Sequence, residues 1–134
     1  MPQATARGDG AAFRHTIKVN GHQLVADEPS DIGGGGSAPT PLDLLAASLA
    51  SCTAITVQMY AQHKGWDLGD IEVSAEYEPA ERGRPTRFST VMRLPSSLTD
   101  EQRERLEIIA AKCPVHRTLE GEVMFEERVE PLSS

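Results

Sequence analysis

The stretch that decides the fold of this chain is Pro41-Leu42-Asp43-Leu44-Leu45-Ala46-Ala47-Ser48-Leu49-Ala50-Ser51-Cys52-Thr53-Ala54. Three signals predict that a helix starts here: Thr40 is a favourable N-cap, Pro41 suits the first helical position, and Asp43 is acidic in the first turn. The helix is expected to run to about Lys64 and to end at Gly65, because glycine is the preferred residue just past a helix.

This helix carries large apolar side chains among small ones. The large ones are Leu45, Leu49 and Ile55, and the small ones are Ala46, Ala47, Ala50 and Ala54. Small side chains let a neighbouring helix approach closely, so we expect this helix to be the buried spine of the protein. Aromatic residues make up only 4% of the 134 residues. One chain therefore has limited means to cover the helix, and we predict an obligate dimer that buries it around Ala46, Ala50 and Ala54.

Alternating segments on both sides of the helix predict strands. They are residues 11–26, folded into a hairpin at Asn20-Gly21 and preceded by a short strand over 5–7, then 71–77 paired with 88–94, and finally 122–129, which should close the sheet. A second helix follows Thr99, with Gln102 completing a capping box and Leu106, Ile109 and Ala110 forming its apolar stripe. The length fits one domain, residues 1–134.

Composition narrows the classes of function. The net charge is −7 and the pI is near 5.0 without a basic stripe, which argues against a nucleic-acid partner. The N-terminus lacks the apolar core of a secretory signal, and the apolar stretch 42–57 is too short to span a bilayer. We therefore expect a cytoplasmic protein, where two cysteines are more often catalytic, metal-binding or structural than a permanent disulfide.

The two cysteines have different settings. Cys52 lies about a dozen residues into its helix, beyond the reach of the helix dipole, and burial should raise its pKa. As a small core residue it would be inert, and a reactive Cys52 needs a cation from elsewhere in the chain. Cys113 is followed by Pro114, which favours a helix boundary, and His116 and Arg117 lie within a turn of it.

Two chemistries remain open for this pair. A thiol that becomes a sulfenic acid and a second thiol that converts it to a disulfide are the minimum for a thiol peroxidase. Cys52, Cys113 and His116 could instead supply three zinc ligands, although no fourth ligand is evident at a typical spacing. The glycine run 33–36 lacks the Gly-Lys-Ser/Thr of a phosphate-binding loop, which favours a loop that needs unusual dihedrals.

Several segments in combination resemble the OsmC/Ohr family, the osmotically inducible and organic hydroperoxide resistance proteins. They are Ala26-Asp27-Glu28-Pro29, the glycine-rich loop, the helical stretch quoted above, and Cys113-Pro114-Val115-His116-Arg117-Thr118-Leu119, which is similar to the broader OsmC-like branch. The resemblance implies an α+β fold and an intertwined homodimer, with antiparallel sheets around long central helices. It also implies an active site at each end of the subunit interface.

The resemblance further implies roles for individual residues. Cys52 matches the peroxidatic cysteine, and Cys113 matches the resolving cysteine. The activating arginine comes from an N-terminal turn, where Arg7 is the nearest match and Arg14 the fallback. In hydroperoxide-resistance members, a glutamate ten residues before the peroxidatic cysteine orients this arginine. This chain has Leu42 at that position, and the acidic Asp43 comes one residue later.

The implied activity is reduction of organic hydroperoxides in oxidative stress defence, without metal, haem or flavin. An external dithiol, in the family sometimes a lipoyl group, would re-reduce the enzyme. No nucleic acid or membrane takes part. The alternative is a non-catalytic member that binds an apolar small molecule at the dimer interface.

Overall fold

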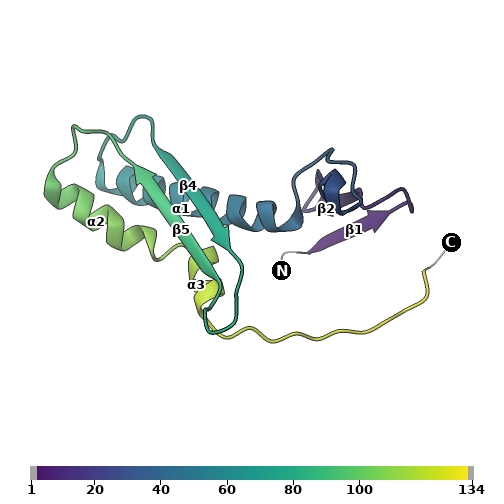
Figure 1. The fold of residues 1–134 in the computed structure, drawn as a ribbon. Helices are drawn as coiled ribbons and strands as arrows, with labels where there is room; N and C mark the ends of the chain where they lie inside the picture. Colours follow the sequence, from purple (N-terminus) through teal and green to yellow (C-terminus); the bar gives the residue numbers. More distant parts are fainter. Residues whose placement is uncertain (1–2, 133–134) are drawn as a thin grey trace. The chain divides into compact units, whose positions relative to one another are not determined.

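The computed structural model describes residues 3–132, which form two compact units. One unit holds the residues up to 48 and residues 75–90, and the other holds 49–74 and the residues from 91 on. The elements, labelled in Figure 1 where there is room, are β1 (Ala4–Gly8), β2 (His15–Val19), β3 (His22–Ala26), η1 (Ser30–Ile32), α1 (Pro41–Lys64), β4 (Glu72–Glu78), β5 (Arg87–Arg93), α2 (Asp100–Ala110) and α3 (Pro114–Glu120). Helix α1 contributes residues to both units.

The first unit contains an antiparallel sheet in the order β1-β2-β3. Its hairpin turns at Asn20 and Gly21, which both have positive φ (50° and 82°). This is the geometry that an Asn-Gly pair favours, and it fixes the register of His15 opposite Ala26. The predicted hairpin and the predicted strand before it are confirmed.

The loop between β3 and α1 is organised by Asp27, which is only 2% exposed. Its carboxylate accepts hydrogen bonds from the backbone N–H of Glu28 (2.8 Å), Gly35 (3.3 Å) and Ser37 (3.2 Å), and from the Ser37 hydroxyl (2.7 Å). A Cβ at Gly34 would lie 1.9 Å from the carbonyl oxygen of Glu28, so no side chain fits there. The glycines therefore serve the path of the backbone, as the sequence predicts.

Helix α1 begins and ends where the sequence predicts, and Gly65 follows it at φ 74°. Its first turn is closed reciprocally: the Asp43 N–H donates to the Thr40 hydroxyl, and the Thr40 N–H donates to the Asp43 carboxylate, both over 3.0 Å. One face of the helix is buried, through Leu49, Thr53, Val57 and Ala61.

Within a single chain Ile55 is not buried, because its side chain is 54% exposed. Two helical steps turn a side chain by about 200°, so Ile55 points away from the face that carries Thr53 and Val57.

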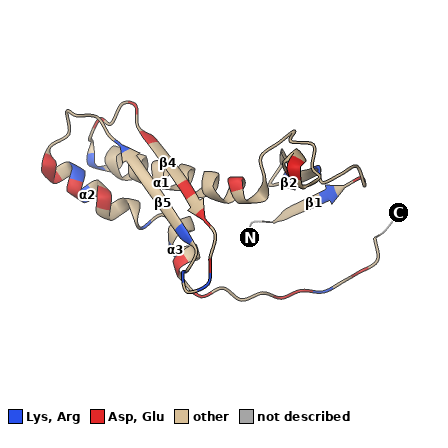
Figure 2. Ribbon diagram, in the orientation of Figure 1, with Lys and Arg blue, Asp and Glu red and all other residues tan. Residues whose placement is uncertain are grey.

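The core of the second unit lies where α1 meets α2. Val57, Ala61, Leu68, Leu98 and Leu106 form it, and Met92 and Leu94 at the end of β5 pack against it. Helix α2 has the predicted capping box between Thr99 and Gln102. Its other residues are mostly exposed, and many of them are charged, as the red and blue positions on α2 in Figure 2 show.

The last predicted strand, residues 122–129, is absent from the described chain. After α3, the segment up to residue 132 forms neither helix nor strand (Figure 1). Its alternating side chains are exposed, Phe125 by 81% and Val129 by 99%. A strand exists only when its backbone N–H and C=O groups pair with a neighbouring edge, and this segment has no such pairing here. The prediction of a closing strand within one chain is therefore wrong.

Candidate functional site: two adjacent thiols

Helices α1 and α3 bring the two cysteines together. Cys52 is half-buried on α1, and Cys113 is fully buried (0% exposed) at the N-cap of α3. Both thiols are free, and they lie close enough for each to shift the pKa of the other. The predicted pair of thiols thus lies within one compact unit.

Cys113 is surrounded by hydrogen-bond donors. Its sulfur takes the place that a serine or aspartate usually has at an N-cap, and it accepts the N–H of His116 over 3.3 Å. The Thr53 hydroxyl and the Val115 N–H, which Cys113 shares with Cys52, also favour its ionised form. Burial opposes ionisation, but these donors and Cys52 together hold the pKa of Cys113 below its ordinary value.

Cys52 is affected in the opposite sense. Burial raises its pKa, and the neighbouring Cys113 raises it further. The Val115 N–H and the Thr56 hydroxyl donate to Cys52 and lower its pKa, but they do not offset the burial. The direction agrees with the expectation from the sequence. In this chain the thiolate is therefore favoured at Cys113, and ionisation of Cys52 requires a further positive group.

Three of these donors were not predicted from the sequence: Thr53, Thr56 and the amide of Val115. A signal for Thr56 does exist, because it lies four residues after Cys52 and so on the same face of the helix. Thr53 and Val115 depend on how α3 packs against α1, which no local pattern gives.

The predicted activating residues lie in the first unit. Arg7 is exposed on β1, opposite Thr16. Arg14 donates from Nη1 to the Ser37 hydroxyl over 2.6 Å, and Ser37 is held by Asp27. Asp43 closes the first turn of α1 with Thr40. Each residue thus has a defined place in the first unit, and Asp43 has the structural role at the helix start that the sequence indicates.

The described part of the chain offers no set of side chains that could bind the zinc ion considered from the sequence. Residues 3–132 contain no group of three or more His, Cys, Asp or Glu side chains that could hold a metal ion. The ring of His116 is turned to Glu120, with Nε2 and Oε2 3.0 Å apart. His116 therefore contributes its backbone N–H to Cys113, and its side chain serves α3.

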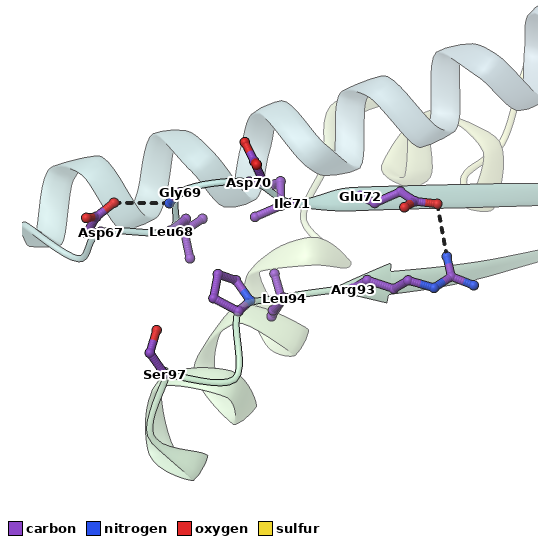
Figure 3. A pocket seen from close by; sticks show the side chains of 10 residues that line it. Asp67, Leu68, Gly69, Asp70, Ile71, Glu72, Arg93, Leu94 and Ser97 are labelled. Atoms are coloured by element: carbon purple, nitrogen blue, oxygen red, sulfur yellow. Dashed lines mark hydrogen bonds and ion pairs between the residues drawn. The ribbon is translucent and has the colours of Figure 1, made fainter.

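A separate cavity of about 570 Å³ lies in the second unit, between the loop 67–72 and the end of β5 (Figure 3). Two of its acidic side chains are engaged locally: the Asp67 carboxylate accepts the Gly69 N–H over 3.0 Å, and Glu72 pairs with Arg93 over 3.4 Å. Neither cysteine lines it. The cavity therefore adds nothing to the thiol chemistry.

Comparison with known proteins decides the family. A family model described as OsmC-like protein matches residues 34–128, which is more than half of the chain and includes both cysteines. The chain belongs to the OsmC/Ohr family. A search of curated proteins found no match.

Solved structures have the same fold. A candidate osmotic stress induced and detoxification response protein from Psychrobacter arcticus 273-4 is 25% identical, with a TM-score of 0.72 over 86% of this chain and 85% of that chain. An organic hydroperoxide resistance protein OsmC from Legionella pneumophila is 21% identical, with a TM-score of 0.67 over 90% of each chain. OhrB of Bacillus subtilis is 20% identical, with a TM-score of 0.61 over 90% of this chain and 91% of that chain.

Family membership also bears on helix α1. By length and composition alone, α1 could cross a membrane, and the core helix of a soluble protein can meet the same criteria. OsmC/Ohr proteins are soluble. The face of α1 that carries Val57 and Ala61 packs into the core of the second unit. We therefore interpret α1 as a core helix.

Proposed function

We propose that this protein is a cysteine-based peroxidase that reduces organic hydroperoxides in the cytoplasm as part of peroxide defence. The observation that carries the proposal is the contact between the Cys52 and Cys113 thiols. Membership of the OsmC/Ohr family and the likeness to organic hydroperoxide resistance proteins support it.

The reaction divides into three steps. The Cys52 thiolate attacks the distal oxygen of the hydroperoxide, the O–O bond breaks, and the alkoxide takes a proton and leaves as the alcohol. The Cys113 thiolate then attacks the sulfur of the Cys52 sulfenic acid, a disulfide forms, and hydroxide leaves as water. An external dithiol, such as a lipoyl group, reduces the disulfide by two thiol–disulfide exchanges. No metal, haem or flavin enters these steps.

The different burial of the two thiols explains why Cys52 reacts with the peroxide and Cys113 acts in the second step. Cys113 is fully buried, whereas Cys52 is partly exposed and can be reached by a peroxide. Three donors on Cys113 favour its thiolate, and the attack on a sulfenic acid requires a thiolate. In the first step, Cys113 can accept the Cys52 proton and then give it to the departing alkoxide, so that Cys113 is again a thiolate for the second step.

Cys52 still needs stabilisation as a thiolate, because its pKa is raised. We assign this task to an arginine of the N-terminal sheet, Arg7 in the first place and Arg14 as the fallback, with Asp43 as a candidate to orient it. A guanidinium stays charged at neutral pH and can serve a thiolate and a carboxylate together. We propose that a homodimer completes the site.

A steady-state assay with a dithiol reductant tests this function. We expect turnover with cumene hydroperoxide that exceeds turnover with hydrogen peroxide, and no turnover in Cys52→Ser. Cys113→Ser should reduce one equivalent of peroxide and then stop as the sulfenic acid.

Equal inactivity of the wild type and Cys52→Ser toward both peroxides would reject the proposal. The non-catalytic alternative, binding of an apolar small molecule at the dimer interface, would then remain, and the raised pKa of Cys52 would agree with it.

A further inference from the structure

Helices α1 and α2 carry a group of aromatic and basic side chains that the thiol chemistry does not use. We call it the Tyr60 cluster, and it consists of Tyr60, Lys64, Trp66 and Arg105, all in the second unit. The Arg105 Nε–H donates to the Tyr60 hydroxyl over 2.9 Å, and the guanidinium carbon lies 5.7 Å from the centroid of the same ring. Arg105 on α2 is therefore held against α1 by a defined contact.

This contact leaves the outer end of the Arg105 guanidinium unused. A guanidinium has five N–H donors in a planar fork, and only the one on Nε serves Tyr60. In the described part of the chain, the Nη1 and Nη2 groups have no hydrogen-bond or ion-pair partner. Glu101 lies one turn earlier, at the spacing of a helical ion pair, yet Arg105 turns to Tyr60 instead. The neighbouring Arg103, by contrast, pairs with Asp100 over 3.3 Å.

A second cation lies against the same ring. Lys64 follows Tyr60 by one turn of α1, and its Nζ is 5.7 Å from the ring centroid. Like Arg105, Lys64 is exposed and has no carboxylate partner among the described residues. Two unpaired cations at one ring repel each other, and an anion bound to both would remove this repulsion.

We propose that the Tyr60 cluster binds the oxyanion of a small molecule, either a carboxylate or a phosphate. The Nη1 and Nη2 groups of Arg105 suit two oxygens of such a group at once, and Lys64 adds a point charge. The Tyr60 hydroxyl fixes the guanidinium before the ligand arrives, which reduces the entropy lost on binding. Neither cysteine belongs to the cluster, so this site is independent of the proposed peroxidase activity.

The local field at the cluster is positive, although the net charge of the chain is −7. The hydrogen bond from Arg105 lowers the pKa of Tyr60 most, and the charges of Arg105, Lys64 and Lys112 lower it further, against the effect of burial. The same charges favour a bound anion. An ionised Tyr60 would compete for them, so anion binding should weaken as the pH rises through the pKa of Tyr60.

Trp66 provides a direct probe of the site. It is the only tryptophan of the chain, and its ring packs edge-on against Tyr60, with the centroids 5.7 Å apart. The reduced full-length protein is titrated with inorganic phosphate and, separately, with benzoate at constant ionic strength, and binding is followed by calorimetry and by Trp66 fluorescence. We expect saturable binding of at least one of the two anions, with a change in fluorescence. The anion that binds more tightly identifies the preferred oxyanion.

Three substitutions locate the binding. Arg105→Gln removes the fork and should weaken binding about tenfold or more, since hydrogen bonds to a charged group are lost. Lys64→Gln should weaken it less, because an exposed charge is screened by water. Arg103→Gln is the matched control: it makes the same change on the same helix, but Arg103 is already paired with Asp100. Its affinity should equal that of the wild type. Urea denaturation establishes that each variant is folded.

The inference would be overturned if the wild type bound neither phosphate nor benzoate saturably. It would also be overturned if Arg105→Gln bound the anion as tightly as the wild type. An equal loss of affinity in Arg103→Gln and Arg105→Gln would show a general effect of surface charge, and would equally reject a site at the Tyr60 cluster.

Discussion

Asp27 shows how a single buried carboxylate sets the path of the loop that leads into α1. Hydrogen bonds from the Ser37 hydroxyl and from the Glu28, Ser37 and Gly35 amides lower its pKa from 3.8 to about 2, against the effect of burial. A carboxyl group with a lowered folded-state pKa contributes stability above its unfolded pKa, and this contribution is lost as the pH falls.

We therefore expect the free energy of unfolding to decrease as the pH is lowered from about 4 to about 2, measured by urea denaturation at each pH. Asp27→Asn should be less stable at neutral pH and should lose less stability over this range. Asp31→Asn, on the exposed turn η1, is the matched control and should behave as the wild type. An unchanged pH dependence in Asp27→Asn would contradict this role.

The two arginines can be distinguished at the same scale. Arg14 is tied to the Ser37 hydroxyl, whereas Arg7 lies exposed on β1. If Arg7 is the activating cation, Arg7→Ala should raise the pKa of Cys52 and slow its oxidation by cumene hydroperoxide about tenfold, because each pKa unit is about 1.4 kcal/mol. Stopped-flow measurement of sulfenic acid formation gives this rate.

Arg14→Ala serves as the comparison. A slow Arg14→Ala beside a normal Arg7→Ala would transfer the role to Arg14. Normal rates in both variants would contradict activation by either arginine.

At the scale of elements, the caps of α1 and α2 form a natural pair for comparison. Thr40 with Asp43 and Thr99 with Gln102 make the same reciprocal hydrogen bonds at the two helix starts. Thr40→Ala and Thr99→Ala should each lower the free energy of unfolding by about 1 kcal/mol, measured by urea denaturation.

Asp43→Ala should lower the free energy of unfolding by a similar amount. Its effect on the peroxidase rate then separates the capping role of Asp43 from its proposed role in orienting the arginine. A wild-type rate would mean that Asp43 only caps the helix. A loss of rate that Thr99→Ala does not share would support the orienting role. Full wild-type stability in Asp43→Ala would contradict the capping role that the hydrogen bonds indicate.

The elements also show which signals the sequence carries. The starts of α1 and α2 and the hairpin at Asn20-Gly21 were predicted because caps and tight turns depend on a few adjacent residues. The sequence did not show that Ile55 is exposed within one chain, because a helix with alanines on all sides gives no clear apolar face. The donors from Thr53 and Val115 come from packing of α3 on α1, which is not encoded in either segment alone.

At the scale of the whole molecule, the exposed apolar side chains suggest what is missing from one chain. The alternating segment after α3 has no strand to pair with, and Ile55 and Met59 are exposed on α1, by 54% and 65%. An alternating pattern predicts a strand but does not say which edge it joins, so the sequence could not show whether the edge belongs to the same chain.

We predict that a second copy supplies this edge and covers α1. Light scattering at micromolar concentration should give the mass of a dimer. Phe125→Asp should shift the protein toward monomer, because it places a charge on a side chain that the dimer buries. Glu126→Gln, on the opposite side of the segment, should remain dimeric. A stable and well-folded wild-type monomer would contradict the predicted dimer.

Formation of the Cys52–Cys113 disulfide on stoichiometric oxidation tests the central claim most directly. The reduced protein is treated with one equivalent of cumene hydroperoxide, and its intact mass and peptide map are determined by mass spectrometry without a reductant. The predicted result is the loss of two hydrogen atoms per chain, with a single peptide pair joined through Cys52 and Cys113 of the same chain. Recovery of both cysteines as free thiols, under conditions in which the peroxide remains unconsumed, would contradict the claim.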